Sequence, residues 1–427
     1  MRFLRAGLVG ILALIARAVL ARYRPRIVAV TGSVGKTSTK EVAAKMLATR
    51  YRVRETEGNY NTEIGVPLTI LGQRLPRSPL LWPWLLLKSL WFLTGTSDYP
   101  EVLVLELAAD RPGDLKHLAG LVRPDVAVVT NVRNVHREFY DSLDRITEEK
   151  GWLVRCLKNT GTAVLNADDP RVREMRSLTT AKIRLYGERR GAHIRLQSAE
   201  HSRGGYRATV EFGERDVTLR TGVHGKAQLL AIIAALGAAD ALEVPLPDAL
   251  KAAGGWTPPP GRLRVFEGRH GRTIVDDTYN ASPEATIASL EALQAFPPPR
   301  RAVLGDMKEL GSESAAGHRT VGKAAAKLVD ELVAVGDDAA AIAAAAKEAR
   351  LATGSIHLAS NALEAAKIVD RLGRGGSLLV KGSQSMYLEQ IVAAELKHPR
   401  DRARLLQRLS DPWHAKRAGV TGWGKRG

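Results

Sequence analysis

A phosphate-binding loop is the clearest chemical motif in the sequence. An apolar run at 28–30 leads into Thr31-Gly-Ser-Val-Gly-Lys-Thr-Ser38, and a helical pattern follows. Glycines let backbone amides approach phosphate oxygens, and the start of a helix adds the positive end of its dipole. A plain strand–turn–helix connection is the alternative, but Gly-Lys-Thr in this context favours phosphate binding. The expected nucleotide contacts are Gly32, Ser33, Gly35, Lys36, Thr37 and Ser38, with Lys36 on the β- and γ-phosphates and Thr37 on Mg²⁺.

Three further polar residues follow predicted strands or lie on a helix of the same region. Glu106 ends an apolar strand, where a carboxylate reaches the ligand crevice of a parallel sheet, and it is a candidate Mg²⁺ ligand or a salt-bridged strand end. His136 follows another strand and is a metal ligand, a phosphate contact or a structural histidine. Lys150 lies in a helix beside two glutamates; the default expectation is a solvated surface lysine, and nothing in the spacing alone singles it out.

Polar turns also end three strands of the second half, at 276–283, 305–311 and 381–385, and the last two contain glycine. Because the carboxyl ends of parallel strands meet at one sheet edge, we expect one site rather than three separate loops. Asp277 and Asn280 are candidate ribose or base contacts there.

Short β-branched runs typical of strands alternate with helical patterns along the chain, and these elements must position the residues above. This alternation predicts an α/β fold with mostly parallel sheets. The predicted strands are 27–30, 102–106, 126–130, 163–166, 273–277, 302–305, 331–335 and 377–380. The predicted helices are 36–49, 143–157, 226–242, 284–296 and 316–328, and a β-rich excursion spans 193–221.

A Gly/Pro cluster at 254–261 is typical of a hinge and divides the chain. We expect an N-terminal helix (1–25), a central P-loop-type ATPase domain (26–257, with an apolar insertion at 78–95), a smaller Rossmann-like C-terminal domain (258–396) and a basic tail (397–427). Arg262, just after the hinge, is placed to bring a cation to a phosphate.

Composition excludes several classes of protein. The 427 residues are 45% hydrophobic and 25% charged, which is typical of a globular chain and not of a disordered or fibrous one. Cys156 is the single cysteine, so no internal disulfide or cysteine-based zinc site can form, as in a reducing compartment. The net charge of +18 favours anionic partners, but only 5% of residues are aromatic, which argues against nucleic-acid binding.

Two apolar segments suit a membrane surface better than a membrane span. The run at 6–16 lies between arginines and is about half the length that a spanning helix needs. A signal peptide is disfavoured because export would separate the phosphate loop from cytosolic nucleotides. The second segment, 80–93, is rich in tryptophan and carries only Lys88. We expect a cytoplasmic protein, peripheral at the inner face of the membrane through 1–25 and 80–93; packing on the core is the alternative.

Ten motifs, in order over about residues 27–395, resemble the Mur ligases. They are GSVGKTS (32–38), GNYNTEIGVPL (58–68), VLELAADRPGDL (104–115), TNVRNVH (130–136), EEKG (148–151), LNADDPRV (165–172), GRL (261–263), DDTYNASP (276–283), LGDMKELG (304–311) and VKGSQSM (380–386). Two of them, DDTYNASP and LGDMKELG, are most similar to the branch of the family that joins D-alanyl-D-alanine to a muropeptide.

The resemblance implies an ADP-forming amide ligase of peptidoglycan precursor synthesis that activates a carboxylate as an acyl phosphate. The implied cofactors are ATP, two Mg²⁺ ions and a carbamylated Lys150. The implied metal ligands are Thr37, Glu106, His136 and Lys150, and the implied catalytic residues are Lys36, Lys150, His136 and Arg262. Arg262 would contact the γ-phosphate, Asp277 the ribose, Asn280 the adenosine region and Asp306 the nucleotide; the implied substrate contacts are Asn59, Asn61, Lys381 and Ser383.

The sequence departs from the family pattern in three places, one of which is the apolar segment at 80–93. Only about 25 residues precede the phosphate loop, where the family has a domain that binds the uridine nucleotide, so we expect that domain to be lacking. Gly225 and Gln228 stand where asparagines are usual. The acceptor is therefore a UDP-linked muropeptide or, alternatively, a lipid-linked or other carboxylate. A non-catalytic nucleotide-binding protein at the membrane surface and a simple GTPase are less favoured, and we expect a monomer.

Overall fold

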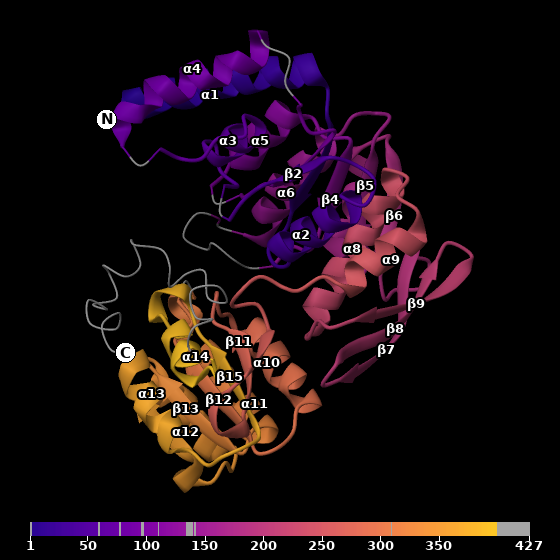
Figure 1. Cartoon of the computed structure of the whole chain (residues 1–427). Helices are drawn as coiled ribbons and strands as arrows, with labels where there is room; N and C mark the ends of the chain where they lie inside the picture. Colours follow the sequence, from indigo (N-terminus) through magenta and orange to yellow (C-terminus); the bar gives the residue numbers. More distant parts are fainter. Residues whose placement is uncertain are drawn as a thin grey trace. The chain divides into compact units, whose positions relative to one another are not determined.

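A computed structural model shows two compact α/β units (Figure 1). It describes residues 2–58, 60–76, 78–94, 98–109, 111–133, 140, 142–308 and 310–398. The N-terminal unit comprises residues up to Glu200, Tyr206–Gly222 and Ala227–Trp256; the C-terminal unit begins at Thr257 and includes His201–Gly205 and Val223–Lys226.

The sheet of the N-terminal unit has the strand order β2-β3-β1-β4-β5-β6-β7-β8-β9. Its strands are β1 (Arg26–Thr31), β2 (Val53–Glu55), β3 (Val102–Glu106), β4 (Val126–Val129), β5 (Thr162–Asn166), β6 (Lys182–Gly187), β7 (Ile194–Ser202), β8 (Gly205–Phe212) and β9 (Arg215–Thr221). Strands from β2 to β7 in this order pair in parallel, and β8 pairs with β9 antiparallel.

Helices cover the parallel part of this sheet (Figure 1). They are α1 (Arg2–Tyr23), α2 (Lys36–Leu47), α3 (Gly65–Ile70), α4 (Trp82–Thr94), α5 (Asp114–Val122), α6 (Leu143–Arg155), α7 (Pro170–Glu174), α8 (Lys226–Ala241) and α9 (Leu246–Gly254). Strands β3, β4 and β5 are buried along their whole length, as their continuous apolar runs require when both faces are covered. The phosphate loop leaves β1 in the interior of this sheet, between β3 and β4.

The C-terminal unit has a second sheet, in the order β10-β11-β15-β12-β13-β14. Its strands are β10 (Arg264–Glu267), β11 (Thr273–Asp277), β12 (Arg300–Gly305), β13 (Glu331–Val335), β14 (Ile356–Ala359) and β15 (Ser377–Lys381), and only the β10–β11 pair is antiparallel. Its helices are α10 (Pro283–Ala292), α11 (Ser314–Leu328), α12 (Ala339–Glu348), α13 (Ala362–Arg371) and α14 (Glu389–Glu395).

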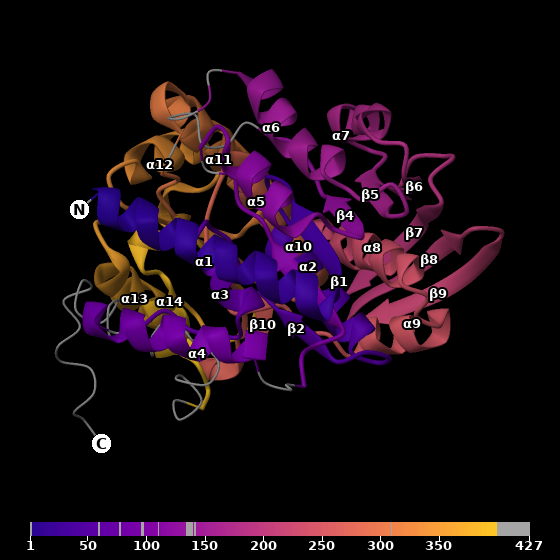
Figure 2. The same cartoon turned by 90° about the horizontal axis from the view of Figure 1, so that it is seen from above.

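Helices α1 and α4 lie side by side in the N-terminal unit (Figure 2). The Tyr23 hydroxyl at the end of α1 donates a hydrogen bond to the Phe92 carbonyl of α4, at 2.9 Å. The Tyr23 ring also stacks on Tyr99, with ring centroids 4.5 Å apart. Both helices therefore belong to the folded unit, and packing on the core explains part of their apolar character.

The expected fold class is confirmed, because both units are α/β layers on mostly parallel sheets. Strands 273–277 and 331–335 have the expected bounds, and helix 143–157 ends two residues early. Strands β2, β6, β10 and β14 were not expected. No helix in the described ranges combines the length and the apolarity that crossing a membrane needs. The expected tail lies outside the described residues from 399 onward.

Candidate active site

The phosphate loop depends on two glycines. Gly32 has a φ of 148°, and a Cβ there would collide with the Thr130 hydroxyl. Gly35 has a φ of 86° and immediately precedes α2. Both backbone conformations favour glycine, since a side chain is strained at positive φ. The first turn of α2 carries backbone amides without intrahelical acceptors, which is the arrangement that binds a phosphate.

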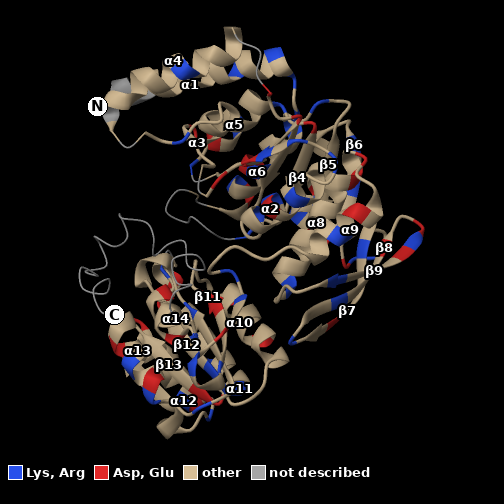
Figure 3. Cartoon of the chain, viewed as in Figure 1, with Lys and Arg blue, Asp and Glu red and all other residues tan. Residues whose placement is uncertain are grey.

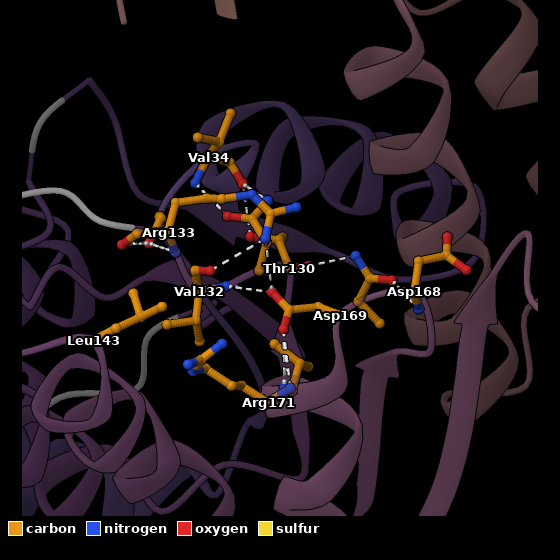
Figure 4. Close-up of polar contacts among 12 residues, drawn as sticks. Val34, Thr130, Val132, Arg133, Leu143, Asp168, Asp169 and Arg171 are labelled. Atoms are coloured by element: carbon orange, nitrogen blue, oxygen red, sulfur yellow. Dashed lines mark hydrogen bonds and ion pairs between the residues drawn. The ribbon is translucent and has the colours of Figure 1, made fainter. Parts of the chain in front are cut away.

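Residues that follow β4 hold the loop in shape (Figure 4). Thr130 Oγ1 donates to the Val34 carbonyl at 2.7 Å, and Asn131 Nδ2 donates to the same oxygen at 3.0 Å. The Val34 amide donates to Asn131 Oδ1 at 2.9 Å. These bonds pair both the amide and the carbonyl of Val34 at the tip of the loop. Side chains about 100 residues away in the sequence therefore fix the conformation of the loop.

The Lys36 side chain folds back onto the phosphate loop that precedes it. Its Nζ donates to the carbonyls of Gly32 and Ser33, at 2.9 and 3.3 Å. Thr37, half-buried in the first turn of α2, and the buried Ser38 come next. The loop thus gathers an ammonium group, a hydroxyl and helix amides, which together suit a nucleotide phosphate with its Mg²⁺.

Glu106 supplies a carboxylate beside the loop. It ends β3, where it is in register with Val30 of β1, and the residue is 3% exposed. Asn61 Nδ2 donates to its Oε1 at 3.0 Å. Its buried Oε2 has no hydrogen-bond partner among the described residues. A buried carboxylate oxygen without a donor is costly, and a hard cation would compensate for it, so Glu106 fits a Mg²⁺ site.

Lys150 is not the solvated surface residue that is the default expectation for a lysine. Its exposure is 3%, because it shares the buried face of α6 with Ile146, Leu153 and Val154. The neighbouring Glu149 accepts the amides of Gly113 and Leu115 at 2.9 and 2.8 Å, and so holds the start of α5. The apolar residues at helical spacing around Lys150 were the available signal for its burial. His136 and Asn59 lie outside the described residues.

Asp169, which the sequence reasoning did not single out, braces the segment after β4 (Figure 4). It caps α7 by accepting the Arg171 amide at 3.0 Å, and it also accepts the Val132 amide at 2.8 Å. Arg133 Nη1 lies 3.2 Å from the same carboxylate. One carboxylate therefore joins α7 to the residues that hold the phosphate loop. The Asp-Pro pair in LNADDPRV was the signal, since an acidic N-cap before proline is a helix start.

In the C-terminal unit, Asp277 is a centre of hydrogen bonding. Its Oδ2 accepts the Ser289 hydroxyl and Lys381 Nζ, both at 2.6 Å, and its Oδ1 accepts the Leu263 amide at 3.2 Å. A carboxylate has about four acceptor positions, so about one is left over, and the ribose contact expected of Asp277 stays a prediction. Lys381 also donates to the Asn280 carbonyl at 2.9 Å. The amine-substrate contact expected of Lys381 stays a prediction.

The GRL segment is clamped to the same turn. The Gly261 amide donates to Asp276 Oδ2 at 2.9 Å, and the Tyr279 amide donates to the Gly261 carbonyl at 3.0 Å. The Arg262 guanidinium lies 4.1 Å from the centroid of the Tyr279 ring. Burial raises the pKa of Asp276 to about 6, against the lowering effect of its hydrogen bonds. Arg262 is thus presented on a rigid support.

The remaining two turns of this unit meet at Asp306. This buried carboxylate accepts the amides of Asp337 and Asp338, each at 3.0 Å, and pairs with Lys308 at 2.8 Å. The backbone carbonyl of Asp306 accepts the Ser383 amide at 3.0 Å. With the Asp277–Lys381 pair, these contacts join the ends of β11, β12 and β15. The nucleotide and substrate roles of Asn280, Asp306 and Ser383 stay predictions.

The local backbone and packing explain why residue 225 is a glycine. Its φ is 79°, and a Cβ there would collide with the Leu263 side chain. An asparagine, usual at this place in the resembling family, would have to displace Leu263.

Two family models match this chain. The Mur ligase middle domain matches residues 30–77 and 87–239, and the Mur ligase glutamate ligase domain matches 261–384. The chain belongs to the Mur ligase family. It is an ATP-dependent peptide ligase that forms ADP.

Individual relatives agree with this assignment. The UDP-N-acetylmuramoyl-tripeptide--D-alanyl-D-alanine ligase of Bacillus subtilis is 29% identical over 90% of this chain and 79% of its own length. The enzyme of the same name from Escherichia coli is 32% identical over 86% of this chain and 76% of its own length. The structure of MurF ligase from Thermotoga maritima in complex with ADP is 32% identical, with a TM-score of 0.75 over 94% of this chain and 84% of that one.

Proposed function

We propose that this ligase joins D-alanyl-D-alanine to the peptide carboxylate of a muropeptide, as the names of its relatives describe for them. The observation that carries the phosphoryl-transfer half of the proposal is the buried Oε2 of Glu106 beside the phosphate loop, which has no hydrogen-bond partner in the part of the chain that the structure describes. The identity of the two substrates rests on the relatives.

The reaction has two steps that the site residues serve. A carboxylate oxygen of the muropeptide attacks the γ-phosphorus of ATP, and the bond to ADP breaks. The amine of D-alanyl-D-alanine then attacks the acyl-phosphate carbonyl carbon, inorganic phosphate leaves, and the amine loses a proton. Lys36 and Arg262 are the cations that offset the approach of two anions in the first step. We expect Lys381 and Ser383 to face the incoming amine.

Mg²⁺ neutralises phosphate charge when it is bound, and Thr37 and Glu106 are the described residues that would hold it. His136 is proposed for a second ion. A carbamate on Lys150 would turn this buried ammonium side chain into an anionic metal ligand, formed by addition of its amine nitrogen to CO₂ with loss of a proton. Incubation with ¹³C-bicarbonate tests this: a carbamate carbon signal in the native protein that is absent in Lys150→Met supports it, and no such signal in either contradicts it.

The muropeptide acceptor is proposed to be UDP-linked, with a lipid-linked muropeptide as the second candidate. The apolar, basic helices α1 and α4 are the observation that favours the second candidate. We place the enzyme in the cytoplasm as a monomer. Contact of 1–25 and 80–93 with a membrane surface is a separate proposal, because ligation does not require it.

A coupled assay tests the proposed function. Protein, ATP and Mg²⁺ are incubated with D-alanyl-D-alanine and either UDP-MurNAc-tripeptide or its lipid-linked counterpart, and the amide product is measured by mass. We expect product with the UDP-linked acceptor, and a loss of roughly 100-fold or more in Lys36→Met, because the loop cation acts on the developing phosphate charge. Lys251→Met, at an exposed position on α9, is the matched control and should retain activity.

Each outcome has a defined meaning. Product only from the lipid-linked acceptor would replace the UDP-linked assignment. Phosphate release that depends on neither muropeptide nor D-alanyl-D-alanine would contradict the proposed substrates while leaving the ligase class in place.

A further inference from the structure

Helices α1 and α4 expose an unusual amount of apolar side chain. Trp84, Leu87 and Trp91 of α4 are 65%, 61% and 67% exposed, and their spacing places them on one side of the helix. We call the exposed apolar residues of this region the α1–α4 face. They are Ile11, Leu14, Leu80, Leu81, Trp84, Leu87, Leu90 and Trp91. Most other exposed large apolar side chains of the described chain stand singly elsewhere, which is ordinary for a protein surface.

The exposed side chains of the α1–α4 face do not anchor the two helices to the core, since other residues of each helix do so. Helix α1 turns Leu12, Ala16 and Val19 into the core, and none of them is exposed. Helix α4 buries Leu85, and Phe92 packs against the same core. Each helix is thus anchored by one side, and its opposite side carries large apolar groups that hydrophobic patterning would normally replace by polar ones.

The charges on the two helices have a single sign. Residues 1–40 and 64–97 contain no Asp or Glu. Arg17 and Arg22 of α1 and Lys88 of α4 are exposed. Figure 3 shows blue but no red on the two helices. This combination of tryptophan, leucine and basic residues without acids is complementary to a surface that is apolar below and anionic above.

We propose that the α1–α4 face docks on the surface of a bilayer that contains anionic phospholipid. Tryptophan and leucine enter the interfacial region, and the arginines and Lys88 contact phosphate groups. A second copy of the chain is a poorer occupant, because pairing two such faces would bring like charges together. The docking is independent of the ligase reaction and places the active unit at the membrane without a spanning helix.

Flotation of the full-length protein with vesicles tests the proposal. One set of vesicles is phosphatidylcholine alone, and the other contains phosphatidylglycerol in addition. We expect the protein to float with the phosphatidylglycerol vesicles, and the floated fraction to fall as salt rises, because screening weakens the attraction of exposed charges.

Two variants distinguish binding through the α1–α4 face from non-specific binding through other exposed apolar side chains. Trp84→Ser/Leu87→Ser/Trp91→Ser removes exposed side chains only and is expected to weaken partitioning by roughly tenfold or more, because binding scales with the apolar area inserted. Leu358→Ser/Leu363→Ser is the matched control, since these residues are 54% and 47% exposed in the C-terminal unit. The control should float like the native protein, and both variants should keep native ligation in solution and a native circular dichroism spectrum.

Several results would overturn the proposal. These are no flotation with either vesicle, equal flotation of the triple variant and the native protein, or loss of flotation in the control variant. A dimer in sedimentation velocity that disappears in the triple variant would assign the face to a second copy instead. A native protein that floats only with anionic vesicles, together with a triple variant that stays in the soluble fraction, supports it.

Discussion

Lys381 and Asp277 form a buried ion pair, with Nζ and Oδ2 2.6 Å apart, between residues that stand opposite each other on neighbouring strands β15 and β11. Because Asp277 also accepts the Leu263 amide, the pair connects two strand ends to the segment that carries Arg262. The pair therefore helps to fix the turns that follow β11 and β15 in the C-terminal unit.

Lys381→Met should destabilise the protein strongly, because it leaves the Asp277 carboxylate buried without its cation. The expected loss is about 3–5 kcal/mol of unfolding free energy, measured by guanidinium denaturation. Lys397→Met is the matched control: its partner Glu267 and Lys397 itself are 72% and 54% exposed, so its loss should stay below about 1 kcal/mol. Equal losses in the two variants would contradict the structural role given to the buried pair.

Glu106→Gln should raise the Mg²⁺ concentration needed for half-maximal ligation. The amide retains the shape of the side chain but removes the negative charge offered to a cation. The expected shift is at least the roughly 10–100-fold that loss of an outer-shell partner costs in metal sites. Glu148→Gln, at an exposed position on α6, should leave the Mg²⁺ titration unchanged. An unchanged titration in Glu106→Gln would remove Glu106 from the metal site.

Asp169→Ala should cost about 1–3 kcal/mol of stability, since it removes a helix cap and leaves the buried Val132 amide without an acceptor. It should also raise the KM for ATP, because the segment after β4 supports the phosphate loop. Asp144→Ala, whose side chain is 89% exposed, should change both quantities little. A destabilised Asp169→Ala with native KM would show that the brace serves stability alone.

Acid should destabilise the protein through His224. This ring lies 3.0 Å from His201 (Nδ1 to Nε2), and burial, with a smaller effect of His201, lowers the pKa of His224 to about 4. The unfolded chain, with a histidine pKa of about 6.5, binds the proton first as pH falls. Stability should be unaffected by this group above pH 6.5 and should decline from there toward pH 4.

Thermal unfolding midpoints between pH 7.5 and 4.5 measure that decline. His224→Gln, which keeps a polar side chain without titrating, should flatten the pH dependence in this interval. His357→Gln, on β14, is the comparison variant and should retain the native slope. A slope in His224→Gln equal to that of the native protein would assign the acid sensitivity to other groups.

Local features were predictable from the sequence. Gly32, Gly35 and Lys36 lie within a few residues of each other, so the phosphate loop forms from short-range geometry that the chain itself encodes. Strands 273–277 and 331–335 contain the buried apolar runs Ile274–Val275 and Leu332–Val335, and such runs are read directly from residue type. The family resemblance rests on motifs of the same local kind.

Contacts between distant segments required the tertiary structure. Lys381 and Asp277 are 104 residues apart, and Asn61 and Glu106 are 45 apart, so no local pattern pairs them. Lys150 is the instructive failure: its residue type predicts exposure, whereas the face of α6 on which it lies is buried. Residue type and spacing determine which local element forms and which side chains it carries. Which of those side chains meet, and which are withdrawn from water, is decided only when the elements pack, because packing sets burial and brings remote charges within bonding distance.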